Sequence, residues 1–378
     1  MTASLPPQRR GFLRRHVVKL LASAVITAGF VYTAHRGGLK LVPASGDFST
    51  VRWAYLPLYV ALFLAMTWFR SVRWSSLLRS VTTVPQRRIF AVSCAGFLAI
   101  LALPFRLGEL ARPYLLSHRS GARAADPPGL TMTTAVSSIV AERVIDGMFL
   151  SLVLAATLLL VPTVQPLPDR VVGLPISVAQ VRLTGFAMLG VFSAALVTIA
   201  VFYFARGWAV RATRAVVGRV STRLAERLAT LVSKLADGLH VFGRGRDAAR
   251  FLAETAAYWG FNAVGMWVLA IGCGVVHADG SAMTLPESAA LMGLLGCAIL
   301  IPGPPGLLGV FQAGLYAGMT MYFPTAIVTG PGAAYVFLLY ISQVVATVLL
   351  GLWGIWSEGG TQELRAAFDD TAAEPLSP

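Results

Sequence analysis

The segment IFAVSCAGFLAILAL, residues 89–103, is apolar almost throughout, and the charged segment PFRLGELARPY, residues 104–114, follows it directly. The apolar run is shorter than the roughly 20 residues that a helix needs to cross a bilayer. The proline that follows the run stops a straight helix. A short apolar segment that ends in this way is typical of a broken or re-entrant helix. We therefore predict that residues 89–103 enter the membrane and that the chain then returns to the side it came from.

A second short apolar run, Ser288–Ile301, ends in the same way before the stretch PGPPGLLG, residues 302–309. Both stretches contain the pattern Pro-x-x-x-Gly. The predicted structural breaks are Pro104, Gly108, Pro302, Pro305 and Gly309. If the loops 277–287 and 324–332 both lie outside, the second hairpin enters from the opposite face, which is the pattern of an inverted repeat. Prolines and glycines also recur in ordinary membrane helices, so the sequence leaves the repeat open.

The composition places these runs in a membrane protein. Of the 378 residues, 56% are hydrophobic and 13% are charged, whereas soluble domains carry about 25% charged residues. Six further segments come close to or exceed the length of a transmembrane helix. They are Val17–Ala34, Ala54–Phe69, Leu130–Val161, Leu183–Ala205, Phe251–Val276 and Ala333–Trp356. We predict an all-α, polytopic transmembrane bundle of about six full spans plus two re-entrant hairpins, which makes eight hydrophobic segments.

The net charge of +14 fits the positive-inside rule, because the basic residues gather between the apolar runs. No recognition motif for nucleic acid accompanies them, so we expect no nucleic-acid partner. Counting spans from a basic N-terminus, residues 1–16, predicts cytoplasmic loops at residues 70–88 and 206–250. The first of these loops holds Arg70, Arg73, Arg79, Arg87 and Arg88. Residues 17–357 then form a single transmembrane domain, and an acidic flexible tail, residues 358–378, also lies in the cytoplasm.

Residues 206–250 form the largest predicted aqueous segment. Apolar residues recur there at helical spacing, namely Val217, Val220, Leu224, Leu228, Leu231 and Leu235. Arg219, Arg223 and Arg227 lie about one turn apart on another face. This pattern predicts a basic amphipathic helix that lies on the membrane surface. Two roles stay open: the arginines bind anionic head groups, or the apolar face packs on the bundle.

Charged residues follow the first break at a regular spacing. Arg106, Glu109 and Arg112 recur every third residue and would share one side of a helix. Non-helical backbone at membrane depth is buried in protein or lines a wet cavity, and charges there are candidates for function. Two arginines and one glutamate leave one positive charge over, which suits a phosphate. The alternative is an ion pair that only locks the hairpin.

A second charged group lies inside the apolar segment Leu130–Val161. Glu142 and Asp146 share a face of the predicted helix, and Arg143 is placed to reach Asp146. Such side chains must point into the bundle or into a cavity. A substrate site and an interhelical clamp onto Arg106 or Arg112 both stay open.

The second break adds polar groups without a pattern for metal binding. A half-helix that begins near Pro305 would aim its N-terminal amides at an anionic group, and Gln312 lies close by. The cysteines, Cys94, Cys273 and Cys297, lie in apolar segments and form no C-x-x-C pair, and the histidines share no ligand spacing. We therefore expect no metal, no cofactor and no catalytic residue.

These motifs together carry a family resemblance. Arg73-Trp74 is followed by Leu-Pro-x-Arg-x-Gly-Glu-x-x-Arg-Pro at 103–113, by Glu-Arg-x-x-Asp at 142–146, and by a Pro/Gly-rich break before Gly-Val-Phe at 309–311. This order resembles the lysylphosphatidylglycerol synthase transmembrane-region family, over roughly residues 17–357. The resemblance implies a flippase-like domain that moves a charged or modified lipid, of phospholipid, glycolipid or hopanoid type, between leaflets.

On that resemblance, the residues that line the path are Arg106, Glu109, Arg112, Glu142, Arg143 and Asp146, and Gln312 joins them as a substrate-binding candidate. The family often has Glu at the position of Gln312, which puts a charge-dependent role there in doubt. The aminoacyl-transferring domain of the bifunctional synthases is not expected after residue 357, so we do not expect this chain to make lysyl-lipid.

The predicted function is therefore lipid transport in the plasma (inner) membrane of a bacterium. The expected partners are membrane lipids with an anionic or charged head group, and either a second copy of the chain or a protein of envelope biosynthesis. One alternative is a membrane transferase for a polyprenyl or phospholipid substrate, for which Glu142 and Asp146 are the close carboxylate pair. Another is a non-catalytic scaffold of an envelope-lipid pathway.

Overall fold

The structure, a computed structural model, describes most of the chain. The described residues are 41–79, 82–103, 108–117, 132–166, 168–171, 177–219, 221–237, 245–299 and 304–357. Within these ranges all regular structure is helical, apart from two isolated bridges that pair Arg170 with Ser177 and Val276 with Ala282. The predicted all-α class is therefore confirmed.

Five helices of the described residues are long and apolar enough to cross a membrane. They are α2 (Tyr55–Leu78), α5 (Met132–Leu160), α6 (Val178–Phe204), α9 (Gly245–Cys273) and α13 (Pro331–Ser357). Each matches one of the predicted spans, so the polytopic bundle is confirmed. The predicted first span Val17–Ala34, the basic segment 1–16 and the acidic tail 358–378 lie outside the described residues.

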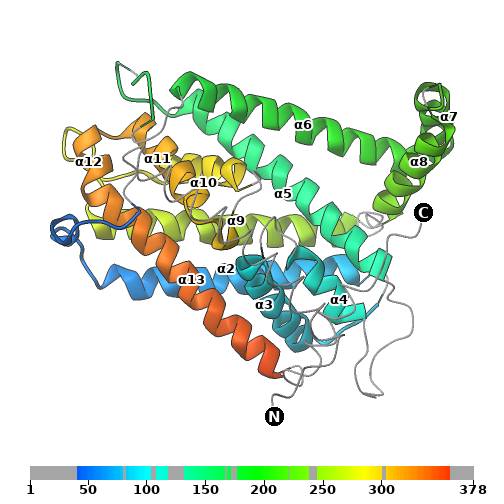
Figure 1. Cartoon of the computed structure of the whole chain (residues 1–378), viewed down its shortest axis with the longest axis horizontal. Coiled ribbons are helices and arrows are strands. Elements are labelled where there is room, and N and C mark those ends of the chain that lie inside the picture. The colour runs from blue at the N-terminus through cyan, green and yellow to red at the C-terminus, as the bar shows by residue number, and fades with distance from the viewer. Residues whose placement is uncertain are drawn as a thin grey trace, which may run out of the picture.

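The long helices run lengthwise through the molecule, and α2 and α9 form an antiparallel pair near its middle (Figure 1). The start of α2 is fixed to the end of α9 because the Arg52 amide donates to the Gly272 carbonyl at 2.8 Å. The Thr50 hydroxyl donates to the Cys273 carbonyl at 2.8 Å. It follows that α2 ends at one end of the bundle and α9 ends at the other.

The first hairpin consists of α3 (Gln86–Ala102) and the short return helix α4 (Ala111–Ser117), which pack against each other. Gly108 passes directly over α3, and a Cβ atom there would lie 2.1 Å from the Ala99 carbonyl carbon. A Cβ atom at Gly96 would lie 2.2 Å from Cγ of Arg112. Only glycine permits these approaches, which explains the predicted break at Gly108. The predicted break at Pro104 lies outside the described residues.

The second hairpin consists of α10 (Leu285–Ala298), the 3-10 turn η4 (Pro305–Leu307) and α11 (Val310–Tyr322). Its chain turns through two glycines with positive φ, 68° at Gly306 and 87° at Gly309, a region that glycine adopts without strain. Gly314 and Gly318 let α11 lie close to α10. The 3-10 turn therefore begins at Pro305 and α11 begins directly after Gly309, so both residues lie at the predicted break, whereas Pro302 lies outside the described residues.

The tips of the two hairpins meet inside the bundle. The hairpins begin at opposite ends, because α3 follows the end of α2 and α10 follows the end of α9 (Figure 1). At the second tip, a Cβ atom on Gly306 would lie 3.6 Å from the Leu101 side chain at the end of α3. The Tyr340 hydroxyl of α13 donates to the Gly306 carbonyl at 3.0 Å. The geometry therefore has the opposed arrangement expected of two re-entrant hairpins.

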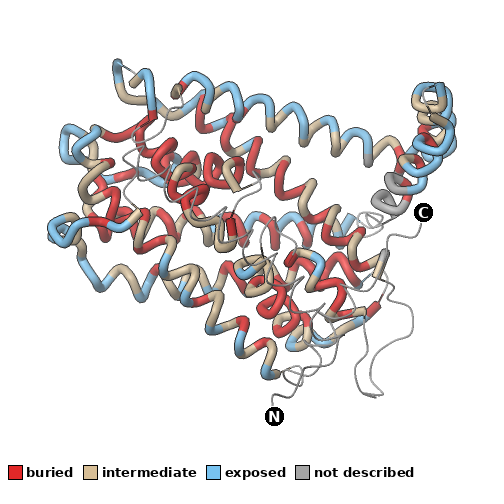
Figure 2. Tube along the Cα trace, in the orientation of Figure 1, coloured by how far each residue is buried: buried red, intermediate tan, exposed pale blue. Residues whose placement is uncertain are grey.

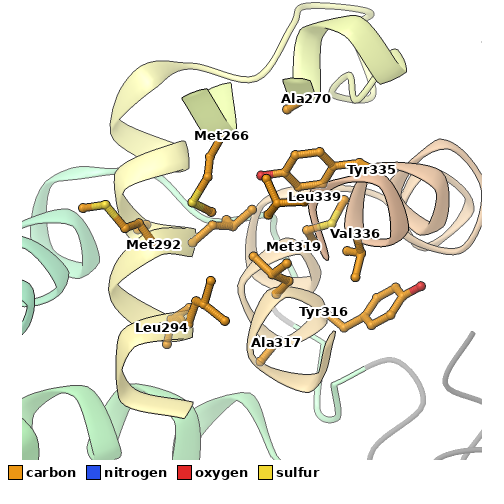
Figure 3. Packing of buried hydrophobic residues seen from close by; sticks show 14 of the residues in the cluster. Met266, Ala270, Met292, Leu294, Tyr316, Ala317, Met319, Tyr335, Val336 and Leu339 are labelled. Carbon is orange, nitrogen blue, oxygen red and sulfur yellow. The ribbon is translucent and has the colours of Figure 1, made fainter. Parts of the chain in front are cut away.

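The largest apolar core lies where α9, α10, α11 and α13 face one another (Figure 3). Figure 3 shows Met266 of α9, Met319 of α11 and Leu339 of α13 gathered there beside α10. Figure 2 shows the contrast with α6, whose tube is mostly exposed or intermediate along its length. Because its exposed residues are apolar, among them Leu183 at 69% exposure, we expect this helix to face lipid.

Residues 206–250 differ from the single amphipathic helix expected there. They form α7 (Arg206–Val217) and α8 (Thr222–Asp237), and residues 245–250 already belong to α9. The interruption falls at Gly218, and the Ser221 hydroxyl accepts a hydrogen bond from the Leu224 amide at 3.2 Å, which caps the next helix. Val217 and Leu224 therefore lie on different helices, and helical spacing alone did not reveal the turn between them.

Gly108→Ala should destabilise the protein by about 1–3 kcal/mol, because the added methyl group meets the α3 backbone and only a shift of the hairpin relieves the clash. Titration with sodium dodecyl sulfate, followed by circular dichroism, measures the change in free energy of unfolding. Gly190→Ala on α6 is the control, since a Cβ atom there meets nothing within 4 Å. Equal stability of the two variants would contradict the close packing of the first hairpin.

Candidate functional site

Ionisable side chains from three helices meet beside the first hairpin. We call them the arginine–carboxylate cluster, and its members are Arg73 of α2, Arg112 of α4, and Glu142, Arg143 and Asp146 of α5. Helical spacing on α5 brings the two carboxylates to one face, as predicted, with Arg143 reaching Asp146 at 3.3 Å. The cluster therefore joins residues that lie far apart in the sequence.

Asp146 is the centre of one half of the cluster. Its carboxylate accepts from the Arg73 guanidinium at 2.5 Å and from the Trp259 indole N–H at 3.3 Å. The Arg73 side chain is fully buried, and its guanidinium lies 4.9 Å from the ring centre of Tyr258, a cation–π contact. One carboxylate thus connects α5 with α2 and, through Trp259, with α9.

Glu142 is the centre of the other half. It contacts Arg143 at 2.6 Å and Arg112 at 3.5 Å, and the side chains of Glu142 and Arg112 are both fully buried. The Arg112 guanidinium lies between two rings, 5.2 Å from the centre of Trp74 and 5.3 Å from that of Phe97. These contacts fix the short helix α4 against α5 and α3.

The Arg112 guanidinium lacks hydrogen bonds in the part of the chain that the structure describes. All three of its nitrogen atoms are buried without an acceptor, and the contact with Glu142 is an ion pair too long for a hydrogen bond. Two nitrogen atoms of Arg73 are in the same state. An unsatisfied buried donor costs roughly 1–3 kcal/mol, more when it is charged. Glu142 Oε2 and Asp146 Oδ2 also lack a hydrogen bond there, so the unpaired donors of the site outnumber its unpaired acceptors.

The charge of the site is also positive. Two further described residues act on it: Arg70 and Glu109 both interact electrostatically with Arg112. With them the described residues supply four arginines and three carboxylates. An oxyanion with several acceptor oxygens, such as a phosphate, matches both the excess charge and the free donors.

The structure brings together most of the predicted site residues. Glu109, Arg112, Glu142, Arg143 and Asp146 lie at one place, whereas Arg106 lies outside the described residues. Gln312 lies elsewhere, at the start of α11. There its carboxamide oxygen accepts from the Gly309 amide at 2.6 Å and caps its own helix.

Arg73 belongs to the site but was not predicted there. The sequence interpretation ended the span at Phe69 and assigned Arg70 and Arg73 to a cytoplasmic loop. In the structure α2 continues to Leu78 and carries Arg73 into the interior. The neighbouring Trp74, Leu77 and Leu78, all buried, are the signal that the helix continues.

Among the described residues, no group of three or more His, Cys, Asp or Glu side chains is placed to hold a metal ion. The cysteines Cys94, Cys273 and Cys297 are buried and free, within the apolar parts of α3, α9 and α10.

Asp146→Asn should lower the free energy of unfolding by about 3–5 kcal/mol, because it leaves the buried Arg73 without its counter-charge. The measurement is the same detergent titration. Glu226→Gln, which breaks the exposed pair of Glu226 with Arg214, is the control and should leave stability unchanged within error. If Asp146→Asn left the free energy of unfolding unchanged, Arg73 would be stable in the interior without a carboxylate partner.

Comparison with known proteins identifies the family of the chain. The family model for the lysylphosphatidylglycerol synthase TM region matches residues 19–354. No curated protein and no solved structure matches the chain. The match covers nearly all of the predicted transmembrane domain and every residue of the cluster. The resemblance is therefore confirmed, and the chain belongs to the lysylphosphatidylglycerol synthase TM region family of membrane proteins.

Proposed function

We propose that this protein binds a lipid through an anionic phosphate in its head group and moves it between the two leaflets. The observation that carries the proposal is Arg112, a fully buried arginine with three nitrogen atoms that lack an acceptor in the described residues. A protein that only needed a clamp would gain by replacing such a group with an apolar side chain. Retention of the charge is explained if a ligand supplies the missing acceptors.

Arg143 is the member of the cluster through which a head group would reach Arg112. Its side chain is 25% exposed, whereas those of Arg73, Arg112 and Glu142 are fully buried. A single nitrogen, Nη2, contacts both Glu142 and Asp146. A phosphate that takes up this nitrogen would compete with the two carboxylates without disturbing the pair of Arg73 with Asp146.

The two hairpins support transport by shortening the path between the two sides. Each reaches only partway through the bundle, and their tips meet at Leu101 and Gly306. Broken helices at membrane depth are typical of transport proteins. α13 packs along α3 at Gly351 and Gly354. The acyl chains would remain in the surrounding lipid, along apolar helices such as α6.

The proposal does not include a chemical step, and the transferase alternative is weaker on these contacts. A divalent cation needs free carboxylate oxygens. Glu142 and Asp146 both contact arginines instead. A scaffold role is separated from transport by the experiment that follows.

Arg112→Met combined with Glu142→Gln should slow lipid transport strongly while the protein stays folded, because both charges of the pair are removed together and Arg143 keeps Asp146 as its partner. Transport is measured in proteoliposomes that contain fluorescently labelled phosphatidylglycerol, phosphatidylethanolamine or a glycolipid. Dithionite outside the liposomes reduces the label of lipids in the outer leaflet, so the loss of fluorescence reports lipids that move there from the inner leaflet. We expect the rate to fall by at least about tenfold, the equivalent of losing one charge-assisted contact. Transport at the wild-type rate by the double variant would refute the proposed site.

Arg79→Gln is the matched control, since Arg79 is exposed and lies just after α2, outside the cluster. Its transport should equal that of the wild type. Detergent titration of each variant shows whether it is folded. If the wild type itself moves none of these lipids faster than empty liposomes, the transport function fails, and a scaffold role becomes the better explanation.

A further inference from the structure

We propose that α7 and α8 form a surface hairpin that binds the anionic lipid head groups of the leaflet beside it. Figure 1 shows the pair at one end of the bundle, with α8 turned well away from the direction of α6. A helix that turns across the end of a transmembrane bundle runs along the membrane surface. The two helices contact each other, and Arg214 of α7 donates to both carboxylate oxygens of Glu226 of α8 at 2.8 and 3.1 Å.

Among the side chains of α8 that the structure describes, those that are buried are small. They include Ala225 and Ala229, one turn apart, which pack towards α5 and α6. Leu224, beside this face, is 46% exposed, and Trp208 of α7 is 61% exposed. The bundle therefore leaves apolar side chains of the pair uncovered at the level of the membrane surface, where aromatic and aliphatic groups insert into lipid.

The remaining face is basic. Residues 206–237 carry seven basic and two acidic side chains, and one of the acids, Glu226, is already paired with Arg214. Arg211 on α7 and Arg223 and Arg227 on α8 are exposed. Arg223 and Arg227 are one turn apart, so they share one side of α8. Guanidinium groups beside an uncovered apolar stripe match an anionic lipid surface, with head groups against the arginines and acyl chains against Leu224 and Trp208.

The pair also contacts the turn of α5 that carries the arginine–carboxylate cluster. Ala209 of α7 packs in one apolar group with Ala141 and Ile145, which flank Glu142 and Asp146 in the sequence. Phe202, near the end of α6, belongs to the same group. Lipids bound to α7 and α8 would therefore lie close to the turn of α5 that carries Glu142 and Asp146.

The test uses a fluorescent label at Leu224→Cys in nanodiscs of phosphatidylcholine with phosphatidylglycerol. The three native cysteines are all buried, so the label reports residue 224. We expect emission typical of an apolar environment and stronger quenching by spin-labelled phosphatidylglycerol than by spin-labelled phosphatidylcholine. Arg223→Gln with Arg227→Gln should remove this preference, since each arginine near the surface enriches an anionic lipid by about fivefold.

Two controls define the outcome. Arg79→Gln with Arg87→Gln removes the same charge from exposed arginines outside the pair and should keep the preference at residue 224. A label at Leu160→Cys, an 81% exposed position at the end of α5, should be quenched equally by both lipids. The proposal is overturned if the label at 224 is in water and quenched by neither lipid. It is equally overturned if both lipids quench it alike, or if the preference survives in the double variant of α8.

Discussion

Asp146 and Arg73 make the contact on which the transmembrane arrangement depends, because neither charge is tolerated alone in a protein surrounded by lipid. The pair ties α2 to α5, and the indole of Trp259 ties α9 to the same carboxylate. The long helices that carry these groups are mostly apolar, and burial of apolar surface does not favour one neighbouring helix over another inside a bilayer. Buried ion pairs and close packing at glycines determine which helices become neighbours. The charged site therefore also determines how the helices are arranged.

The same constraint explains why the two hairpins touch. Each hairpin breaks a helix at membrane depth, which exposes backbone groups that lipid does not hydrogen-bond. At the second tip the Gly306 carbonyl accepts from Tyr340, and the Gly309 amide donates to Gln312. The tips then bury against each other at Leu101 and Gly306. A single half-crossing would leave its tip in lipid, whereas two opposed ones provide each other with protein surroundings.

The span positions were predictable because a bilayer requires long apolar runs, and the charged candidates were predictable because charge is rare in such runs. The structure brought Arg112 to Glu142 as one of the anticipated clamps. Arg73 was missed because an arginine near the end of an apolar run is usually a loop residue, and only tertiary contacts bury it. The break after Val217 was missed because apolar spacing continues across the turn. The role of Gln312 as a cap depends on backbone geometry at Gly309 that no residue pattern specifies.

The turn of α5 from Ala141 to Asp146 makes ion pairs on one side and apolar contacts on the other. Glu142 and Asp146 hold the arginines on one side, while Ala141 and Ile145 pack with Phe251 and with Ala209 of α7 on the other. The ring centre of Phe251 also lies 5.3 Å from the Arg73 guanidinium, so this residue contacts both the apolar group and the charged cluster. The apolar group that includes Ala209 of α7 and the charged cluster therefore meet at one turn of α5.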